Sequence, residues 1–217
     1  GLDAAILRKC GEKVGPKPAL GPWRDFLDRQ RKATKEVHIG LVGKYDLQDA
    51  YKNIREGLLQ AGVYNDHKTV ITFINSEDLT EANVGEKLQG QDGIVICPGF
   101  GQRGIEGKIV AAHYTRTHNI PTFGICLGMQ MMVIEFARNV LGYKDANSRE
   151  MDEKTAHNVI DIMEEQKNIT NMGGTMRLGA YECVLRQGSR VFDIYRQEHI
   201  QERHRHRYEF NNDYEKE

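Results

Sequence analysis

Residues 121–130 read Pro-Thr-Phe-Gly-Ile-Cys-Leu-Gly-Met-Gln, and this stretch decides the fold. A short apolar run ends at Gly124, and apolar residues then recur every three or four positions up to Val140, as in a helix. Cys126 stands between Gly124 and Gly128, whose lack of a Cβ leaves room for a very tight strand-to-helix turn. The pattern predicts a nucleophile elbow, with a helix N-terminus that lowers the pKa of the Cys126 thiol. The alternative is an inert buried cysteine.

Strand and helix patterns alternate in the part of the chain before the elbow. We expect strands at residues 37–42, 69–75, 93–97 and 121–125, and helices at residues 49–61, 104–117 and 127–140. Such alternation implies right-handed crossovers, so we predict an α/β fold with a doubly wound, mainly parallel sheet of the flavodoxin type. Strand patterns at residues 157–163, 178–186 and 203–210 predict a small antiparallel extension of that sheet.

The first 36 residues differ from the rest in composition. Three of the five prolines fall between Gly11 and Pro22, and a short charged helix pattern follows at residues 23–31. We expect residues 1–36 to be an interdomain linker with the tail of an upstream domain, and residues 37–217 to form the compact domain.

The composition argues against several classes of partner. The chain has 30 basic and 31 acidic side chains, which is no signature of binding to nucleic acid or to acidic membranes. Neither a membrane-spanning apolar run nor a signal peptide is present in the sequence. The four cysteines show no paired or metal-ligand spacing, so we expect free thiols, no metal site and a cytoplasmic location.

Three loops are expected at the carboxyl ends of the parallel strands, where sites form in such sheets. They are residues 43–46, residues 98–104 and the elbow. Glycines at positions 99, 101 and 104 let backbone N–H groups approach a ligand, so the second loop is a candidate oxyanion hole. A glycine-rich turn that binds nothing is the alternative.

A row of arginines at positions 203, 205 and 207 alternates with histidines at positions 204 and 206. On a strand the arginines share one face, from which they can bind a carboxylate or phosphate, and the histidines point the other way. A solvated basic edge strand is the alternative.

These signals converge on a known family. Residues 124–130 resemble the nucleophile motif of class I glutamine amidotransferases. Residues 43–45 with 49–51, 146–148 with Glu150, 173–179 and 202–208 resemble the CTP synthase family in particular. The resemblance implies a glutaminase domain whose ammonia reaches a synthetase (amidoligase) domain of the same chain. That domain uses ATP and Mg²⁺ to aminate UTP to CTP, a ligase reaction of pyrimidine biosynthesis.

The resemblance also implies roles for individual residues. Cys126 attacks L-glutamine and forms a thioester, Arg207 binds the α-carboxylate, and Glu150 binds the α-ammonium group. GTP is implied as an allosteric activator, the domain carries no cofactor of its own, and the full-length protein is a homo-oligomer, a tetramer. The resemblance implies further binding residues. They are Gly99, Leu127, Gly128, Met129 and Gln130 for glutamine, and Lys44, Tyr45, Phe100 and Arg103 for GTP.

The chain departs from the family pattern in two places. Pro98 stands where the family has glycine, so its missing N–H leaves Gly99 and Leu127 as the oxyanion donors. The family's His-Pro-Glu tripeptide does not occur, and His199, His204 and His206 lack a carboxylate two residues later to orient the ring. We therefore expect an incomplete C-terminal segment. Two other functions stay open: a DJ-1-like cysteine hydrolase, and a regulatory module that binds glutamine or GTP without turnover.

Overall fold

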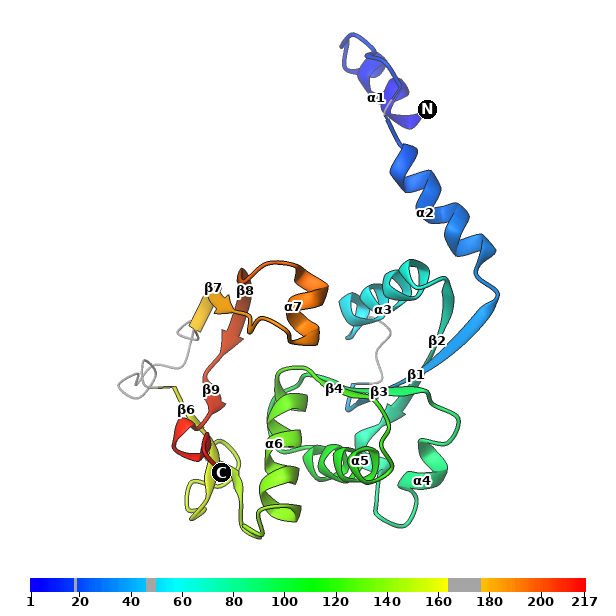
Figure 1. Cartoon of the computed structure of the whole chain (residues 1–217). Coiled ribbons are helices and arrows are strands. Elements are labelled where there is room, and N and C mark those ends of the chain that lie inside the picture. Colours follow the sequence, from blue (N-terminus) through cyan, green and yellow to red (C-terminus); the bar gives the residue numbers. More distant parts are fainter. Residues whose placement is uncertain (18, 46–49, 164–176) are drawn as a thin grey trace. The chain divides into compact units, whose positions relative to one another are not determined.

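The computed structural model of the chain describes residues 1–17, 19–45, 50–163 and 177–217 (Figure 1). The chain divides into two compact units. The first unit combines Gly1–Val37 with Asn53–Thr69, and the second combines His38–Lys52 with Val70–Glu217. Parts of two family motifs, residues 46–49 and 173–176, lie outside the described residues. No helix in the described ranges has both the length and the apolar character needed to cross a membrane.

The first unit contains α1 (Leu2–Lys9), α2 (Gly21–Lys32) and most of α3 (Lys52–Tyr64). The rings of Phe26 and Tyr64 lie 6.2 Å apart, and Arg29 donates a hydrogen bond to the Tyr64 carbonyl at 3.0 Å. Arg29 also pairs with Asp66 at 3.1 Å. The charged helix expected at residues 23–31 is therefore α2, and it packs against the end of α3.

The central sheet contains β1 (Lys35–Gly43), β2 (His67–Asn75), β3 (Gly93–Ile96) and β4 (Thr122–Gly124) in the order β2-β1-β3-β4. β3 is parallel to both β1 and β4. This order is that of flavodoxin-like doubly wound sheets, in which a site forms where the strand order reverses, between β1 and β3. The α/β prediction with a mainly parallel sheet is confirmed.

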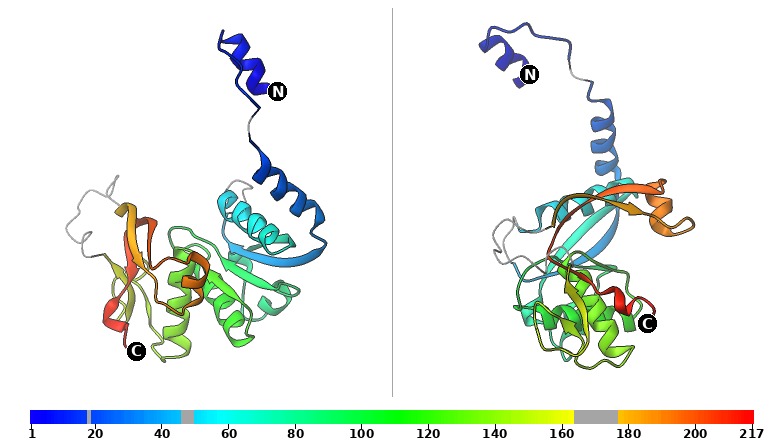
Figure 2. Two further views of the ribbon diagram at one scale, coloured as in Figure 1. Left: turned by 45° about the horizontal axis from the view of Figure 1, so that its top comes forward. Right: turned by 90° about the vertical axis from the view of Figure 1, so that its left-hand side faces the viewer.

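Two long helices of the second unit cover this sheet. The helices α5 (Ile105–Thr117) and α6 (Leu127–Asn139) pack on each other and against β3 and β4, side by side in both views of Figure 2. The short η1 (Ser76–Asp78) and α4 (Val84–Lys87) pack against α5. The side chains enclosed between these elements are apolar and fully or almost fully buried: Val42, Ile94, Ile96, Ala111, Leu127, Met131 and Ile134.

The remaining strands form two small sheets. The first has the order β5-β6-β9, from β5 (Asn147–Ser148), β6 (Asn158–Ile162) and β9 (Tyr208–Phe210), and β6 and β9 are antiparallel. The second pairs β7 (Arg177–Val184) with β8 (His199–His206), also antiparallel. The helices α7 (Arg190–Tyr195) and η3 (Asn212–Tyr214) complete the unit.

The antiparallel strands expected from the sequence are thus present, although in the described residues they do not join the central sheet. The strand expected at residues 203–210 is not continuous, because the chain bends at Arg207 between β8 and β9. This bend decides which side chains of residues 203–207, the alternating arginines and histidines, reach the site described below.

Candidate active site

Cys126 occupies the predicted tight turn between β4 and α6. Its backbone has φ 55° and ψ −113°, a conformation that L-residues rarely adopt. The flanking glycines permit it: a Cβ at Gly124 would lie 2.6 Å from the Met129 nitrogen, and a Cβ at Gly128 would lie 1.9 Å from the Ile96 carbonyl oxygen. The strand-to-helix turn therefore presents the cysteine on a strained backbone, as nucleophile elbows do.

The electrostatics of the thiol differ from the sequence-based expectation. Burial raises the pKa of Cys126, while the N–H of Leu127, the ammonium group of Lys108 and the N–H of Gly99 lower it. Burial is the largest of these effects, so the net pKa is raised and the expected lowering is wrong. The two N–H groups and the ammonium nevertheless place positive potential around the sulfur. Such a potential stabilises a negative charge that forms at this position, as on a thiolate or an oxyanion.

Cys126 opens into a cavity of about 250 Å³. Glu150 and Arg207 also line it, so the two ends of a zwitterionic amino acid find opposite charges in one pocket. Gln130 is buried and holds the wall by a hydrogen bond from Nε2 to the Tyr208 carbonyl at 3.1 Å. The pocket brings together the expected nucleophile and four residues expected to bind glutamine: Cys126, Gly99, Gln130, Glu150 and Arg207. It is also lined by Phe100, which was expected near GTP, and by Arg205, His206 and Tyr208.

His206 is a residue that the sequence analysis placed wrongly. On β8 the alternation holds, with Arg203 and Arg205 exposed and His204 and His206 half-buried. The bend at Arg207 then turns the chain, so that His206 lines the same pocket as Arg207 instead of facing away from it. Strand periodicity alone could not reveal this bend, and no turn-forming residue marks it.

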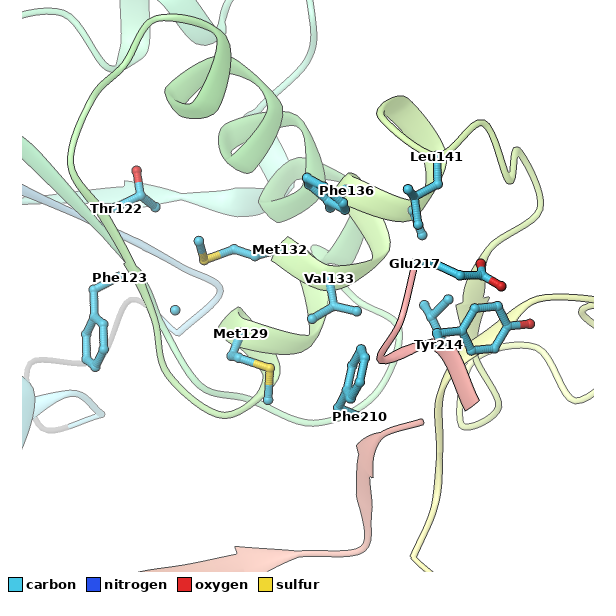
Figure 3. Close-up of a pocket in the computed structure, with 13 residues that line it drawn as sticks. Thr122, Phe123, Met129, Met132, Val133, Phe136, Leu141, Phe210, Tyr214 and Glu217 are labelled. Carbon is cyan, nitrogen blue, oxygen red and sulfur yellow. The ribbon is translucent and has the colours of Figure 1, made fainter. Parts of the chain in front are cut away.

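Three expected glutamine-binding residues do not line the pocket. Leu127 is buried and reaches the sulfur only through its backbone N–H, and Gly128 packs against β3. Met129 is 39% exposed and lines a different cavity of about 500 Å³ beside α6 (Figure 3). That larger cavity is walled mainly by apolar side chains and lacks paired charges for an amino acid, so the smaller pocket is the candidate site. The apolar residues of the larger cavity that Figure 3 labels are Phe123, Met129, Met132, Val133, Phe136, Leu141 and Phe210.

The four residues expected to bind GTP lie close together. The ring centre of Tyr45 is 5.5 Å from the Lys44 ammonium and 5.8 Å from the Arg103 guanidinium. Arg103 is exposed and also pairs with Glu77. Lys44 is almost fully buried, and its ammonium group donates to the carbonyl oxygens of Phe100 and of Gly101, the latter at 3.2 Å. Lys44 therefore holds the loop that follows β3.

Lys108 is a residue that the sequence analysis missed. It is fully buried, and its ammonium donates to the Cys97 carbonyl at 2.6 Å and contacts the Pro98 carbonyl at 3.5 Å. Burial lowers the pKa of Lys108 to about 8. Its burial could have been predicted from the spacing, because Lys108 lies in the apolar helix stripe of Ile105, Ile109 and Ala112, at three- and four-residue intervals. Among the described residues, no group of three or more His, Cys, Asp or Glu could hold a metal ion.

Comparisons with known proteins show the family to which the chain belongs. Residues 46–217 match the family described as glutamine amidotransferase class-I. A CTP synthase of Bacteroides thetaiotaomicron is 72% identical over 216 residues, and one of Porphyromonas gingivalis is 56% identical over 214. These matches cover 99% and 98% of this chain, which spans only 40% of the length of either relative.

A solved structure shows the same similarity. The glutaminase domain of Trypanosoma brucei CTPS with bound acivicin is 39% identical and has a TM-score of 0.75. The match covers 82% of this chain and 69% of that one. The chain therefore belongs to the class I glutamine amidotransferases and, among them, to the glutaminase domains of the CTP synthase family.

Proposed function

We propose that the pocket hydrolyses L-glutamine through a thioester on Cys126, and that the ammonia aminates UTP to CTP in a synthetase domain of the same protein. One observation carries the proposal: a strained cysteine at a helix N-terminus shares a cavity with Glu150 and Arg207. The synthesis of CTP is proposed from the names of the relatives alone. This chain spans about 40% of their length and so corresponds to only part of those proteins.

Substrate orientation follows from the charges that line the cavity. The guanidinium of Arg207 binds the α-carboxylate of glutamine in a bidentate manner, and Glu150 binds the α-ammonium group. Glutamine held at these two points can extend its side-chain amide toward Cys126, which lines the same cavity. The N–H groups of Gly99 and Leu127, which already act on the sulfur, then donate to the amide oxygen as it gains charge.

The reaction proceeds in two halves. The sulfur forms a bond to the amide carbon while the carbonyl electron pair moves to oxygen; the C–N bond then breaks, and nitrogen leaves as ammonia with the thiol proton. Water next adds to the thioester, the C–S bond breaks, and glutamate leaves as the thiol regains a proton. The sum is glutamine and water giving glutamate and ammonia. The family's His-Pro-Glu base is not among the 217 residues, so we assign no base within them.

The proposal extends to the rest of the protein. We assign residues 1–36 to the segment that joins the glutaminase domain, residues 37–217, to the synthetase domain, where ATP and Mg²⁺ act. The cluster of Tyr45 with Lys44, Arg103 and the neighbouring Phe100 is the proposed site of GTP, the activator. The proposal further includes a cytoplasmic homotetramer whose glutaminase domain carries no cofactor of its own.

The test uses the full-length protein that carries this chain. Replacing Cys126→Ala should abolish glutamine-dependent CTP formation while ammonia-dependent formation continues. Cys10→Ala is the matched control, because Cys10 is an exposed thiol outside the pocket. Loss of both activities in the Cys126 variant would assign it a structural role. A wild-type protein that melts at a higher temperature with glutamine or GTP, yet releases no ammonia, would support the regulatory alternative.

A further inference from the structure

Three side chains hold the carbonyl groups of the loop that follows β3. The ammonium of Lys108 donates to the Cys97 carbonyl at 2.6 Å, and the carbonyl of Pro98 lies 3.5 Å from both Lys108 Nζ and Tyr51 Oη. Further along the loop, Lys44 donates to the carbonyl oxygens of Phe100 and Gly101. The contacts come from α5, from the end of β1 and from the segment before α3, so the loop is held from several directions.

Burial of these cations is energetically unfavourable by itself. Lys108 is fully buried and Lys44 is 5% exposed. Moving an ammonium group out of water is strongly unfavourable unless strong acceptors replace its hydration. Burial is the largest cause of the lowered pKa of Lys108, and Lys44 lowers it further, whereas Cys97 and Cys126 raise it. An apolar side chain would fill the same space in α5 without this penalty, which indicates a role other than packing.

The direction of the Pro98 carbonyl fixes the direction of the next N–H group. In a trans peptide the C=O and N–H bonds point to opposite sides, and the Pro98–Gly99 bond is trans. With the Pro98 carbonyl toward Lys108 and Tyr51, the N–H of Gly99 points away from them, and it acts on the sulfur of Cys126. Pro98 itself has no N–H, so the function of this loop as an oxyanion donor depends on Gly99.

The space around Gly99 is also limited by these side chains. A Cβ at this position would lie 3.1 Å from Lys44 Cε and 3.7 Å from Lys108 Nζ. It would also lie 3.4 Å from Leu127 Cδ2. The backbone at Gly99 therefore lies close to both lysines and to Leu127, the first residue of α6.

We propose that Lys108 is a positioning residue of the glutaminase reaction. Its buried ammonium holds the Cys97–Pro98–Gly99 backbone so that the Gly99 N–H faces the oxyanion formed at Cys126, and its charge stabilises that oxyanion. This rests on the proposed function. Tyr51 supports the same carbonyl more weakly, and Lys44 holds the next part of the loop.

The decisive experiment measures glutamine hydrolysis by the full-length protein with Lys108→Met, which keeps the length of the side chain and removes the charge. We expect kcat to fall by about 10²–10³-fold, as when an oxyanion-hole donor is lost. KM for glutamine should change less than about threefold, because Glu150 and Arg207 remain, and ammonia-dependent CTP formation should persist. Lys108→Arg restores a buried cation and should recover part of kcat. Lys87→Met is the control on an exposed lysine.

A second variant decides the matter if Lys108→Met does not fold. Tyr51→Phe removes only the hydroxyl, which contacts the Pro98 carbonyl at 3.5 Å and accepts from the Lys44 N–H at 3.3 Å. We expect a loss of about three- to tenfold in kcat with KM unchanged, in keeping with the loss of neutral hydrogen bonds. A folded Lys108→Met protein with wild-type kcat overturns the proposal, as does wild-type kcat in Tyr51→Phe when Lys108→Met fails to fold. A wild-type protein that does not hydrolyse glutamine at all overturns the proposed function instead, and this inference with it.

Discussion

Arg116 of α5 donates three hydrogen bonds to the buried carboxylate of Glu135 on α6: from Nη2 to Oε1 at 2.8 Å, and from Nε to Oε2 at 2.9 Å and to Oε1 at 3.2 Å. His113 and Asn139 contact the same carboxylate at 2.9 Å and 3.2 Å. Glu135 is only 2% exposed, so α5, which carries Lys108, is joined to α6, which follows Cys126, by a buried polar contact.

Removing one partner of this contact should destabilise the protein. Arg116→Met leaves the Glu135 carboxylate buried with weaker partners, and we expect a loss of about 2–4 kcal/mol in the free energy of unfolding. The double variant Arg116→Met, Glu135→Met should lose less, because no charge remains buried. Urea denaturation of the wild type and the two variants measures both effects, and a double variant that loses as much stability as Arg116→Met, or more, would contradict this account.

The same contact predicts a pH dependence. Burial alone would raise the pKa of Glu135, but the hydrogen bonds from Arg116, His113 and Asn139 outweigh it and lower the pKa below its ordinary 4.5. The stabilisation is therefore complete above pH 4.5 and is lost as pH falls through the folded-state pKa. The difference in melting temperature between wild type and Glu135→Gln should shrink over that acidic range. A difference that stays constant below pH 4.5 would show that the carboxylate charge does not contribute.

Directed labelling should distinguish the cysteines. A glutamine-like electrophile such as a chloro-oxonorvaline or an acivicin-type compound should modify Cys126, because Glu150 and Arg207, the proposed partners of its charged groups, line the same pocket. Cys97 is fully buried, and burial raises the pKa of its thiol to about 12, so it should not react. Peptide mapping at substoichiometric reagent measures the distribution, with iodoacetamide, which should label the exposed Cys10, as the undirected control. Modification mainly at Cys97 would contradict the assignment.

Arg207 and Arg203 should differ in their effect on glutamine recognition. Arg207 lines the pocket, whereas Arg203 is an exposed residue of β8 that does not. Loss of a charge-assisted, bidentate contact is worth about 1.5–3 kcal/mol, so Arg207→Ala should raise KM for glutamine by roughly ten- to hundredfold. Arg203→Ala should leave KM near the wild-type value, and ammonia-dependent synthesis should survive in both. Equal loss of the two activities in Arg207→Ala would indicate a structural residue.

The strain at the elbow can be measured directly. Cys126→Gly allows φ 55° and ψ −113° without a Cβ, whereas Cys126→Ala keeps the Cβ and the strain. We expect the glycine variant to be about 1 kcal/mol more stable than the alanine variant, at the low end of such strain energies because glycine also gains freedom on unfolding. Thermal melting of the two inactive proteins makes the comparison. Equal melting temperatures would contradict this expectation and would show that the strain is no larger than the entropic cost of glycine.

Much of the fold was predictable from local patterns. The parallel strands follow short apolar runs and the two long helices follow three- and four-residue spacing, and their boundaries agree with the structure within a few residues, because β3 and the end of β1 are buried along their whole length and each helix buries a stripe. The elbow was predictable because only small residues tolerate the turn around Cys126. In both cases the physical cause lies within a few consecutive residues.

The rest depends on contacts between distant segments. The bend at Arg207 brings His206 into the pocket, and nothing in the alternation of residues 203–207 shows it. The direction of the pKa shift at Cys126 depends on how completely the thiol is buried, which the elbow motif does not specify. The burial of Lys108 was visible as a cation within an apolar stripe, but its acceptors on β3 and the following loop emerge only in three dimensions.

The unfavourable backbone of Cys126 has an evolutionary consequence. Because glycine suits that backbone better than cysteine does, a population selected for stability alone would tend to replace the nucleophile, while selection for catalysis would keep it. The ratio of cysteine to glycine recovered at position 126 from a randomised library would then measure the strength of selection for activity. A library screened only for expression and one screened for the proposed glutamine-dependent CTP formation should therefore diverge at this position first.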